Sequence, residues 1–362
     1  MTFLANAVPS PKDERDYYYS PIITGNFPPR LDLIPDVFAV ENQLSQGSCV
    51  WHGIPSMAEI LLKRAGKGRH LSREFGYHET LKAAGRLGQE GCNPRDAFKV
   101  GRKLGIPDES IWPYDISKRD VDPPQSVYDA ALLQRIDRYE NLYFQPWGYA
   151  EKKLTMIKGA LMEGLPVGFV MPVTESYQQV HGPLAQQFYL PYGKAPPIGY
   201  HFQVFTGYED SYHGLTALNS WDNTWGDGGF GMIPYRELDC VVEAWVMRGF
   251  DGCGTYRAPG IYCTRNDRTG ISAQIVPTEQ EDRKPVKVWI GAVMAGAGYL
   301  KTDSGAWLPY DGTFPPAIQA TFDGALDINI KDGDFSDMHG VDVYVGYGKT
   351  PFDWKTSKIC TL

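Results

Sequence analysis

A cysteine in the first part of the chain lies in a setting where its thiol could attack a carbonyl group. Cys49 ends the stretch NQLSQGSC, and a run with helical periodicity follows it. An ordinary thiol is a poor nucleophile at neutral pH because its pKa is about 8.5. The start of a helix and an imidazolium neighbour both lower that pKa. Cys49 is therefore a candidate nucleophile, and the same stretch supplies a donor for the oxyanion that attack creates. Gln43 lies six residues before Cys49, and its side-chain amide could act together with the Cys49 backbone N–H.

The base for such a thiol would be a histidine, and the sequence contains seven, at positions 52, 70, 78, 181, 201, 213 and 339. His201 differs from the others because it stands at the head of the apolar stretch GYHFQVFTGYED, which is typical of a strand. Asn219 follows 18 residues later (219 − 201) in LNSWDNTWGDGGFG. Its side-chain oxygen could accept the imidazole N–H and fix the tautomer, and Trp221 could shield that bond from water.

Local patterns predict the elements that would carry these residues. Apolar residues spaced as on one helix face follow Cys49 at Ile54, Met57, Ala58, Leu61 and Leu62, and this helix should end near residues 65–68. Further helices are predicted over 71–85, 93–105 and 152–164, and strands over 165–173, 200–210, 215–221 and 228–235. A helical first half and a β-rich second half indicate an α+β protein with a cleft between two lobes.

Composition divides the chain into four parts. Residues 1–36 are rich in Pro and Tyr and suggest an extended arm, either lying on a domain or mobile. Residues 37–264 form the main domain, 265–284 form a polar linker, and 285–362 form a small β-sandwich with alternating apolar residues. Within the last part, Trp289, Trp307 and Tyr347 could mark an interaction face, although core positions are the stronger interpretation.

Composition also excludes several classes of function. A net charge of −8 without a Lys/Arg block argues against nucleic acid, and no apolar run is long enough to span a membrane, so a protein or peptide partner is expected. The six cysteines form no CxxC pair, which argues against a structural zinc site, and no cofactor or metal is expected. Cys253 and Cys263 could form a disulfide, but spacing cannot fix it. The first residues lack a secretion signal, yet one could have been removed, so the localisation stays open.

With these motifs the sequence resembles the papain-like C1 family of cysteine peptidases over about residues 12–250. The resemblance is carried by NQLSQGSC, GYHFQVFTGY and NSW...WGDGGFG. It implies a two-lobed fold with a helical left lobe, a β-barrel-like right lobe and the active site between them. It also implies that Cys49 is the nucleophile, His201 the general base and acid, Asn219 its orienter, Gln43 the oxyanion donor and Trp221 the shield. His201 and Asn219 follow Cys49 by 152 and 170 positions (201 − 49 and 219 − 49), near the roughly 130 to 150 typical of the family.

The stretches PSPKDERDYYYSP and EGCNPRDAFKVGRKLGIPDESIWPYD resemble a bacterial and phage-associated branch of the family. In that branch the EGCN loop would border the substrate cleft, so Gly91 and Cys92 are predicted to line a specificity pocket. Other positions depart from the plant-type pattern. Gln46 stands where the plant-type motif has a cysteine, so the disulfide usually anchored there is absent. Val50 replaces an aromatic residue, and no long inhibitory propeptide precedes Cys49, although the arm could lie across the cleft.

Three alternatives remain open at this level. The chain could be a catalytically silent binding module that kept the motif residues by descent. It could also be a Cys/His amidase that acts on cell-wall peptides with the same thiol chemistry. Independently of either, the C-terminal β-domain could dock to another protein or to a surface.

Overall fold

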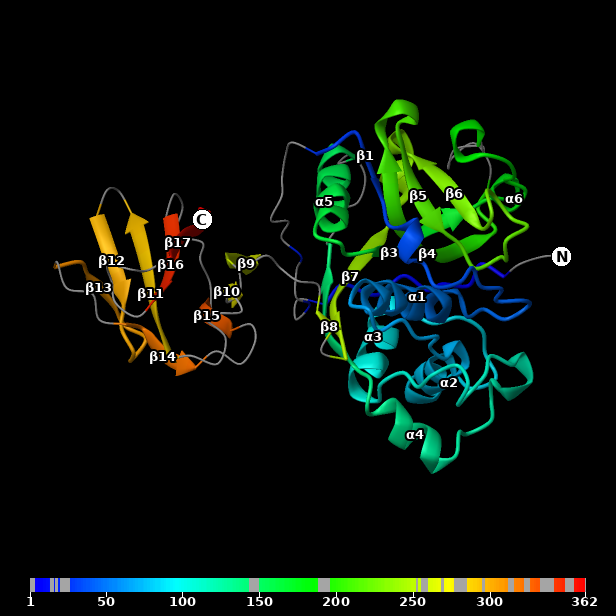
Figure 1. Ribbon diagram of the computed structural model, residues 1–362, viewed down its shortest axis with the longest axis horizontal. Helices are drawn as coiled ribbons and strands as arrows, with labels where there is room; N and C mark the ends of the chain where they lie inside the picture. Colours follow the sequence, from blue (N-terminus) through cyan, green and yellow to red (C-terminus); the bar gives the residue numbers. More distant parts are fainter. Residues whose placement is uncertain are drawn as a thin grey trace. The chain divides into compact units, whose positions relative to one another are not determined.

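The computed structural model describes residues 4–13, 16, 19, 27–142, 150–187, 196–251, 253–254, 260–267, 270–276, 285–294, 297–311, 316–321, 326–332, 342–348 and 355–361. The chain forms two compact units. The first unit comprises Met1–Asp16 and Ile23–Thr255, and the second comprises Tyr17–Ile22 and Tyr256–Leu362. Both helices and antiparallel sheets are present, which confirms the α+β class (Figure 1).

The described helices all belong to the first unit. The α-helices are α1 (Cys49–Arg64), α2 (Arg73–Ala83), α3 (Pro94–Lys103), α4 (Gln125–Ala131), α5 (Ala150–Met162) and α6 (Glu175–Gln178). Short 3₁₀ segments are η1 (Ile34–Asp36), η2 (Ile116–Lys118), η3 (Leu184–Gln186), η4 (Asp210–Tyr212) and η5 (Tyr235–Cys240). Helix starts follow their capping residues: Ser72 accepts a hydrogen bond from the Phe75 N–H, and Asn93 accepts one from the Asp96 N–H. The four helices predicted from periodicity are confirmed as α1, α2, α3 and α5.

Helix α1 is the central element of the first unit, and every residue from Cys49 to Leu62 is buried. Two glycines explain how closely it packs. A Cβ on Gly53 would lie 2.4 Å from the Phe202 ring in the sheet, and a Cβ on Gly76 of α2 would lie 2.1 Å from the Trp51 ring. Figure 1 shows α1 with α2 and α3 on one side and the sheet on the other. The start of α1 is thereby held against both lobes.

The first unit contains one antiparallel sheet, ordered β2-β7-β3-β4-β5-β6, in which β1 also pairs with β4 and β8 with β7. The strands are β1 (Arg30–Asp32), β2 (Ile136–Asn141), β3 (Val167–Val173), β4 (Gly199–Glu209), β5 (Gly214–Leu218), β6 (Phe230–Pro234), β7 (Glu243–Phe250) and β8 (Cys253–Gly254). β3 is buried along its whole length, as its apolar sequence predicted. The long central strand β4 carries His201, which lies opposite Met171 of β3.

The second unit contains two sheets, β15-β10-β9 and β13-β12-β11-β16-β17 with β14 paired to β11. The strands are β9 (Gly260–Asp267), β10 (Gly270–Val276), β11 (Pro285–Met294), β12 (Ala297–Lys301), β13 (Trp307–Pro309), β14 (Ile318–Thr321), β15 (Leu326–Asp332), β16 (Asp342–Gly348) and β17 (Lys355–Thr361). Buried residues from both sheets form one core cluster. Trp289 and Tyr347 are each 2% exposed and Trp307 packs against the cluster, so these aromatic residues belong to the core.

Strands β9 and β10 occupy much of the range 265–284, where the polar composition predicted a linker. The alternating residues Ala273 and Ile275 of β10 are buried in the core cluster. The two strands pair antiparallel, from Asp267 with Gly270 to Gly260 with Val276. Polar composition does not distinguish a linker from paired strands, because it carries no information on strand pairing.

Three cysteines, Cys49, Cys92 and Cys240, are buried free thiols. The side chains of Cys253 and Cys263 lie outside the described residues, so the predicted disulfide stays a prediction. In the part of the chain that the structure describes, no helix is long and apolar enough to cross a membrane.

Candidate active site

Cys49 is the first residue of α1 and is completely buried. Helical periodicity predicted this position, and the structure confirms it. The backbone N–H of Phe202 in β4 acts on the Cys49 thiol and opposes the rise of its pKa, so the thiol lies near the strand residue that follows His201. The start of α1 and the first residues of β4 therefore meet where the two lobes pack together.

His201 and Asn219 lie within hydrogen-bonding distance, with 2.7 Å between His201 Nε2 and Asn219 Oδ1. That oxygen also accepts the Ser220 N–H at 2.8 Å, so it acts as an acceptor and the imidazole carries its proton on Nε2. Among the described residues, His201 Nδ1 has no hydrogen-bond partner. The Trp221 ring stacks on the imidazole with 4.5 Å between centroids. The structure thus brings together the histidine, asparagine and tryptophan that the sequence indicated.

Gln43 connects the loop before α1 to the segment that carries Asn219. Its side-chain oxygen accepts a hydrogen bond from Ser220 Oγ at 2.7 Å, and its backbone N–H donates to the Ser220 carbonyl at 2.9 Å. Its side-chain nitrogen donates to the carbonyl oxygens of Gln46 and Leu4, each at 2.9 Å. The amide is therefore fixed in orientation and presents its N–H groups to backbone oxygens.

The residues 4–13, called here the covering segment, lie against the residues around Cys49. The Ala7 N–H donates to the Tyr200 carbonyl at 2.9 Å, and the Val8 N–H donates to the Cys92 carbonyl at 3.0 Å. Asn6 forms a parallel bridge with Tyr200. Together with the hydrogen bond from the Gln43 side chain to the Leu4 carbonyl, these contacts hold the backbone of the covering segment over the Cys49 thiol. Cys49 and His201 consequently have no exposed surface.

This burial suppresses charge on the Cys49 thiol and on the His201 imidazole. Burial raises the pKa of the Cys49 thiol to about 11, although backbone N–H groups of Phe202, Val50 and Asn6 act in the opposite direction. Burial also lowers the pKa of His201 to about 4, against the hydrogen bond with Asn219 that raises it. At neutral pH the buried Cys49 thiol and the buried His201 imidazole are therefore both uncharged.

Gly91 and Cys92, predicted to line a specificity pocket, border the covering segment. Gly91 has a φ of +80°, which favours glycine, and a Cβ there would lie 1.9 Å from the Asn6 carbonyl oxygen. Cys92 is 3% exposed and contributes its carbonyl oxygen to Val8. Any side chain at position 91 would displace the covering segment. A role of these two residues in substrate specificity stays a prediction.

Two contributors to this site were absent from the sequence-based candidates. Ser220 orients Gln43, and Tyr114 donates a hydrogen bond to the Gln43 carbonyl at 2.8 Å while its hydroxyl also contacts Ser48 Oγ at 2.8 Å. Ser220 lies inside the NSW motif, so its position was a usable signal. Tyr114 lies in an irregular segment 66 residues after Ser48, where no sequence period points to the site.

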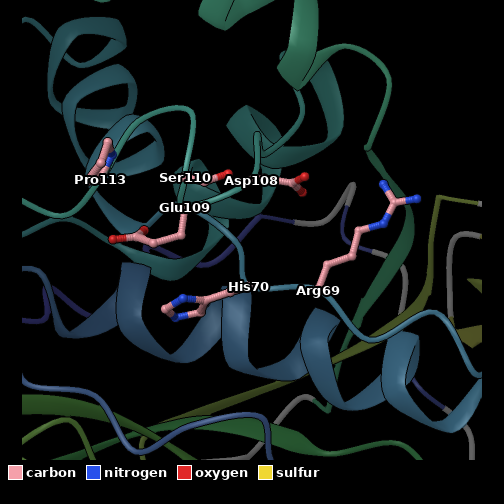
Figure 2. Close-up of a pocket in the computed structure, with 6 residues that line it drawn as sticks. All are labelled: Arg69, His70, Asp108, Glu109, Ser110 and Pro113. Carbon is pink, nitrogen blue, oxygen red and sulfur yellow. The ribbon is translucent and has the colours of Figure 1, made fainter.

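A separate hollow of about 470 Å³ lies on the first unit and contains none of the predicted site residues. It is lined by Arg69, His70, Asp108, Glu109, Ser110 and Pro113. Figure 2 shows Arg69 and His70 on one side, with Asp108, Glu109 and Ser110 on the other. His70 Nε2 lies 2.8 Å from Glu41 Oε1, and its ring stacks on Phe38. Within the described residues, no group of three or more His, Cys, Asp or Glu side chains is arranged to hold a metal ion.

The Glu41–His70 pair predicts a measurable pH dependence of stability. Burial would raise the pKa of Glu41, but the His70 hydrogen bond and the charge of Arg73 outweigh it and lower the pKa to about 2. The pKa of His70 is raised, chiefly by its hydrogen bond with Glu41. The Glu41 carboxylate therefore stabilises the fold above its ordinary pKa of 4.5, and that contribution is lost as the pH falls toward 2. The His70 contribution is present below 6.5 and is lost as the pH rises through its raised pKa.

We expect Glu41→Gln to lower the free energy of unfolding by about 1–2 kcal/mol at pH 5 to 6, and by less as the pH falls below 4. Urea unfolding curves of both proteins between pH 3 and 6 measure this difference. Asp36→Asn is the control, because Asp36 forms a more exposed pair with Arg64. A Glu41→Gln effect that stays constant from pH 6 to 3 would contradict the assignment.

The chain is similar to known proteins in sequence and in structure. The family described as "Papain family cysteine protease" matches residues 28–249. A relative from Acanthamoeba polyphaga mimivirus, named "Uncharacterized peptidase C1-like protein L477", is 27% identical over 236 residues, which cover 63% of this chain and 75% of the relative.

Solved structures give the same result. Xylellain, a cysteine protease from Xylella fastidiosa, has a TM-score of 0.59 and 25% identity, and the match covers 67% of this chain and 95% of that one. Procathepsin B S9 from Trypanosoma congolense has a TM-score of 0.53 and 15% identity, covering 67% and 85% of the two chains. Digestive procathepsin L 3 of Tenebrio molitor has a TM-score of 0.51 and 18% identity, covering 67% and 74%. The last two likenesses concern the fold alone.

Proposed function

Because the chain belongs to the papain family of cysteine proteases, which hydrolyse peptide bonds, we propose that its catalytic site is formed by Cys49, His201 and Asn219, with Gln43 as oxyanion donor. The observation that carries the proposal is the 2.7 Å hydrogen bond from His201 Nε2 to Asn219 Oδ1 beside a thiol at a helix start. This bond leaves Nδ1 as the nitrogen available to exchange a proton with Cys49. The stacked Trp221 ring supports the assignment because it excludes water from the bond.

The proposed reaction is acyl transfer in two steps. His201 takes the thiol proton, and the Cys49 sulfur forms a bond to the peptide carbonyl carbon, whose oxygen becomes an oxyanion near the Gln43 amide. The C–N bond then breaks, and His201 gives its proton to the departing amine, which leaves a thioester on Cys49. In the second step His201 removes a proton from water as the water oxygen bonds to the acyl carbon. The C–S bond then breaks, a carboxylic acid leaves, and His201 returns the proton to the Cys49 sulfur.

The covered geometry is part of the proposal. A peptide substrate would need the space that residues 4–8 occupy, since their backbone uses the Tyr200 and Cys92 carbonyls and the Gln43 amide. We therefore assign this arrangement to a latent form, in which the thiol is uncharged and closed to solvent. The substrate class is protein or peptide, and docking by the second unit remains a hypothesis. The mimivirus relative is named a peptidase C1-like protein and xylellain a cysteine protease, which favours the peptidase over the amidase alternative.

Labelling with an epoxysuccinyl inhibitor tests the proposal. The full chain should gain the mass of one inhibitor at Cys49, and His201→Ala should slow that labelling at least about tenfold because the thiol loses its base. His181→Ala is the matched control, since His181 is exposed and lies outside the proposed site. Labelling of His201→Ala at the rate of the parent protein, or labelling at another cysteine, would refute the site. Intact mass spectrometry and peptide mapping measure both outcomes.

A further inference from the structure

The loop Gln43–Cys49, called here the nucleophile loop, carries two of the proposed catalytic residues and must be held in place. Cys49 is the single cysteine of this loop, so a disulfide within the loop is excluded by its sequence. In this chain Cys49 and Cys92 are both free thiols. Other contacts must therefore fix the loop.

Glu90 makes the most direct of these contacts. One carboxylate oxygen, Oε2, accepts the Gly47 backbone N–H at 2.6 Å and the Tyr77 hydroxyl at 2.9 Å. The other oxygen forms an ion pair with Arg119. Gly47 has no side chain, and a Cβ there would lie 2.9 Å from Glu90 Oε2. The carboxylate is thus seated against the loop backbone two residues before Cys49.

Tyr77 extends this contact to the rim of the cleft. Its hydroxyl donates to Glu90 and accepts the Gly91 N–H at 3.0 Å. A Cβ on Gly47 would also lie 3.0 Å from the Gly91 nitrogen, and the next rim residue, Cys92, presents its carbonyl to the covering segment. One carboxylate and one phenol therefore connect the nucleophile loop to the backbone edge that binds an extended chain.

A second carboxylate supports the same loop from α2. Gln46 Nε2 donates to Glu74 Oε2 at 2.8 Å, and the Gln46 carbonyl in turn accepts from the Gln43 amide at 2.9 Å. Glu74 and Tyr77 are three residues apart on α2, so both lie on the same helix face. Helix α2 thereby contacts consecutive loop residues: Glu74 accepts from Gln46 directly, and Tyr77 reaches Gly47 through Glu90.

We propose that Glu90 is a positioning residue for the reaction, which acts through Gly47 on the oxyanion donors of the nucleophile loop and through Tyr77 on the Gly91–Cys92 rim. This inference rests on the proposed function of Cys49 and Gln43. Glu90 itself touches no reacting atom. Its carboxylate fixes the position of the loop relative to the rim through hydrogen bonds.

The test compares two ligands that carry the same peptide, one ending in an aldehyde and one in the corresponding alcohol. The aldehyde adds the Cys49 thiol across its carbonyl, so its hemithioacetal oxygen uses the oxyanion donors, whereas the alcohol only binds. Closure by the covering segment weakens both ligands equally. The ratio of the two inhibition constants, measured on the full chain, therefore reports the addition of the Cys49 thiol together with the donors to the resulting oxygen, and the effect of closure cancels.

For Glu90→Ala we expect the preference for the aldehyde to fall at least about tenfold, because the Gly47 N–H loses its acceptor and the loop shifts. Tyr77→Phe should weaken both ligands by about the same factor and leave their ratio unchanged, because it disconnects the rim and spares Gly47. Asp120→Asn is the control: Asp120 pairs with the same Arg119 but contacts neither loop nor rim. It should change neither constant by more than about twofold.

A purely structural role would lower the melting temperature of Glu90→Ala without changing the ratio, and that result would overturn the proposal. If Glu90→Ala does not fold, Glu90→Gln provides the test. The amide oxygen of the substituted side chain can still accept the Gly47 N–H, but without the carboxylate charge the ratio of the two inhibition constants should fall about threefold. An unchanged ratio in that variant also overturns the proposal. If the parent protein neither cleaves peptides nor binds the aldehyde better than the alcohol, the proposed function itself fails, and this inference fails with it.

Discussion

Replacing Cys49 with alanine is expected to lower kcat/KM for a fluorogenic peptide by at least about 10⁴-fold while the fold stays intact. The loss is large because the proposed thioester requires the sulfur, and no other side chain at the start of α1 can form it. Alanine fits the first turn of a helix, so the melting temperature should change little. Cys240→Ala is the matched control, because Cys240 is also a buried free thiol but lies at the end of η5.

Casein and cell-wall peptide fragments, assayed side by side, determine the substrate class in the same experiment. Hydrolysis of casein by the parent protein and its loss in Cys49→Ala would agree with a peptidase. Hydrolysis of casein by Cys49→Ala at a rate comparable to the parent protein would refute the proposed nucleophile. Cleavage of cell-wall fragments alone would instead favour an amidase that uses the same thiol.

Local patterns predicted the elements that carry the site. The helix after Cys49 was predicted from apolar residues at helical spacing, and the strand of His201 from a short apolar run; both elements are buried along most of their length. The order of the motifs indicated which residues would face each other across the lobes. The hydrogen bond between His201 and Asn219 has the partners that the sequence suggested.

Contacts between distant segments could not be predicted in this way. The hydrogen bond from the Gly47 N–H to Glu90 joins residues 43 positions apart, and the hydrogen bond from Ser220 Oγ to Gln43 joins residues 177 positions apart. A carboxylate that accepts a backbone N–H leaves no sequence signature, because every residue except proline has such a donor. Residues 265–284 were predicted to be a linker although β9 and β10 occupy part of this range, since charge predicts solvent exposure but not strand pairing.

Removing the covering segment should activate the enzyme by about 100-fold or more. The closed geometry leaves Cys49 without exposed surface, so only the fraction of molecules that have opened can bind a substrate. If about 1% of molecules are open, deletion of residues 1–13 makes all of them competent, and a 99:1 ratio needs only about 2.7 kcal/mol. Steady-state kinetics of the full and shortened chains with one peptide substrate measure this.

A double substitution, Ala7→Pro with Val8→Pro, separates covering from other effects of the deletion. Both prolines remove a backbone N–H, and these are the donors to the Tyr200 and Cys92 carbonyls. At about 1 kcal/mol per hydrogen bond, the closed form loses roughly 2 kcal/mol, which changes a closed-to-open ratio of about 99:1 to about 3:1, so kcat/KM should rise about 20-fold. Val8→Ala is the control, because it keeps both N–H groups and should stay close to the parent protein.

The pH dependence of thiol alkylation gives the covering segment a second readout. Burial under the segment raises the pKa of Cys49 to about 11, because a thiolate without water is costly, and it lowers the pKa of His201 to about 4 for the same reason. Deletion readmits water, so the Cys49 pKa should fall and the His201 pKa should rise. Alkylation by iodoacetamide should then begin at a lower pH in the shortened chain than in the full chain. Identical alkylation profiles together with identical kcat/KM would show that residues 4–8 do not close the site in solution.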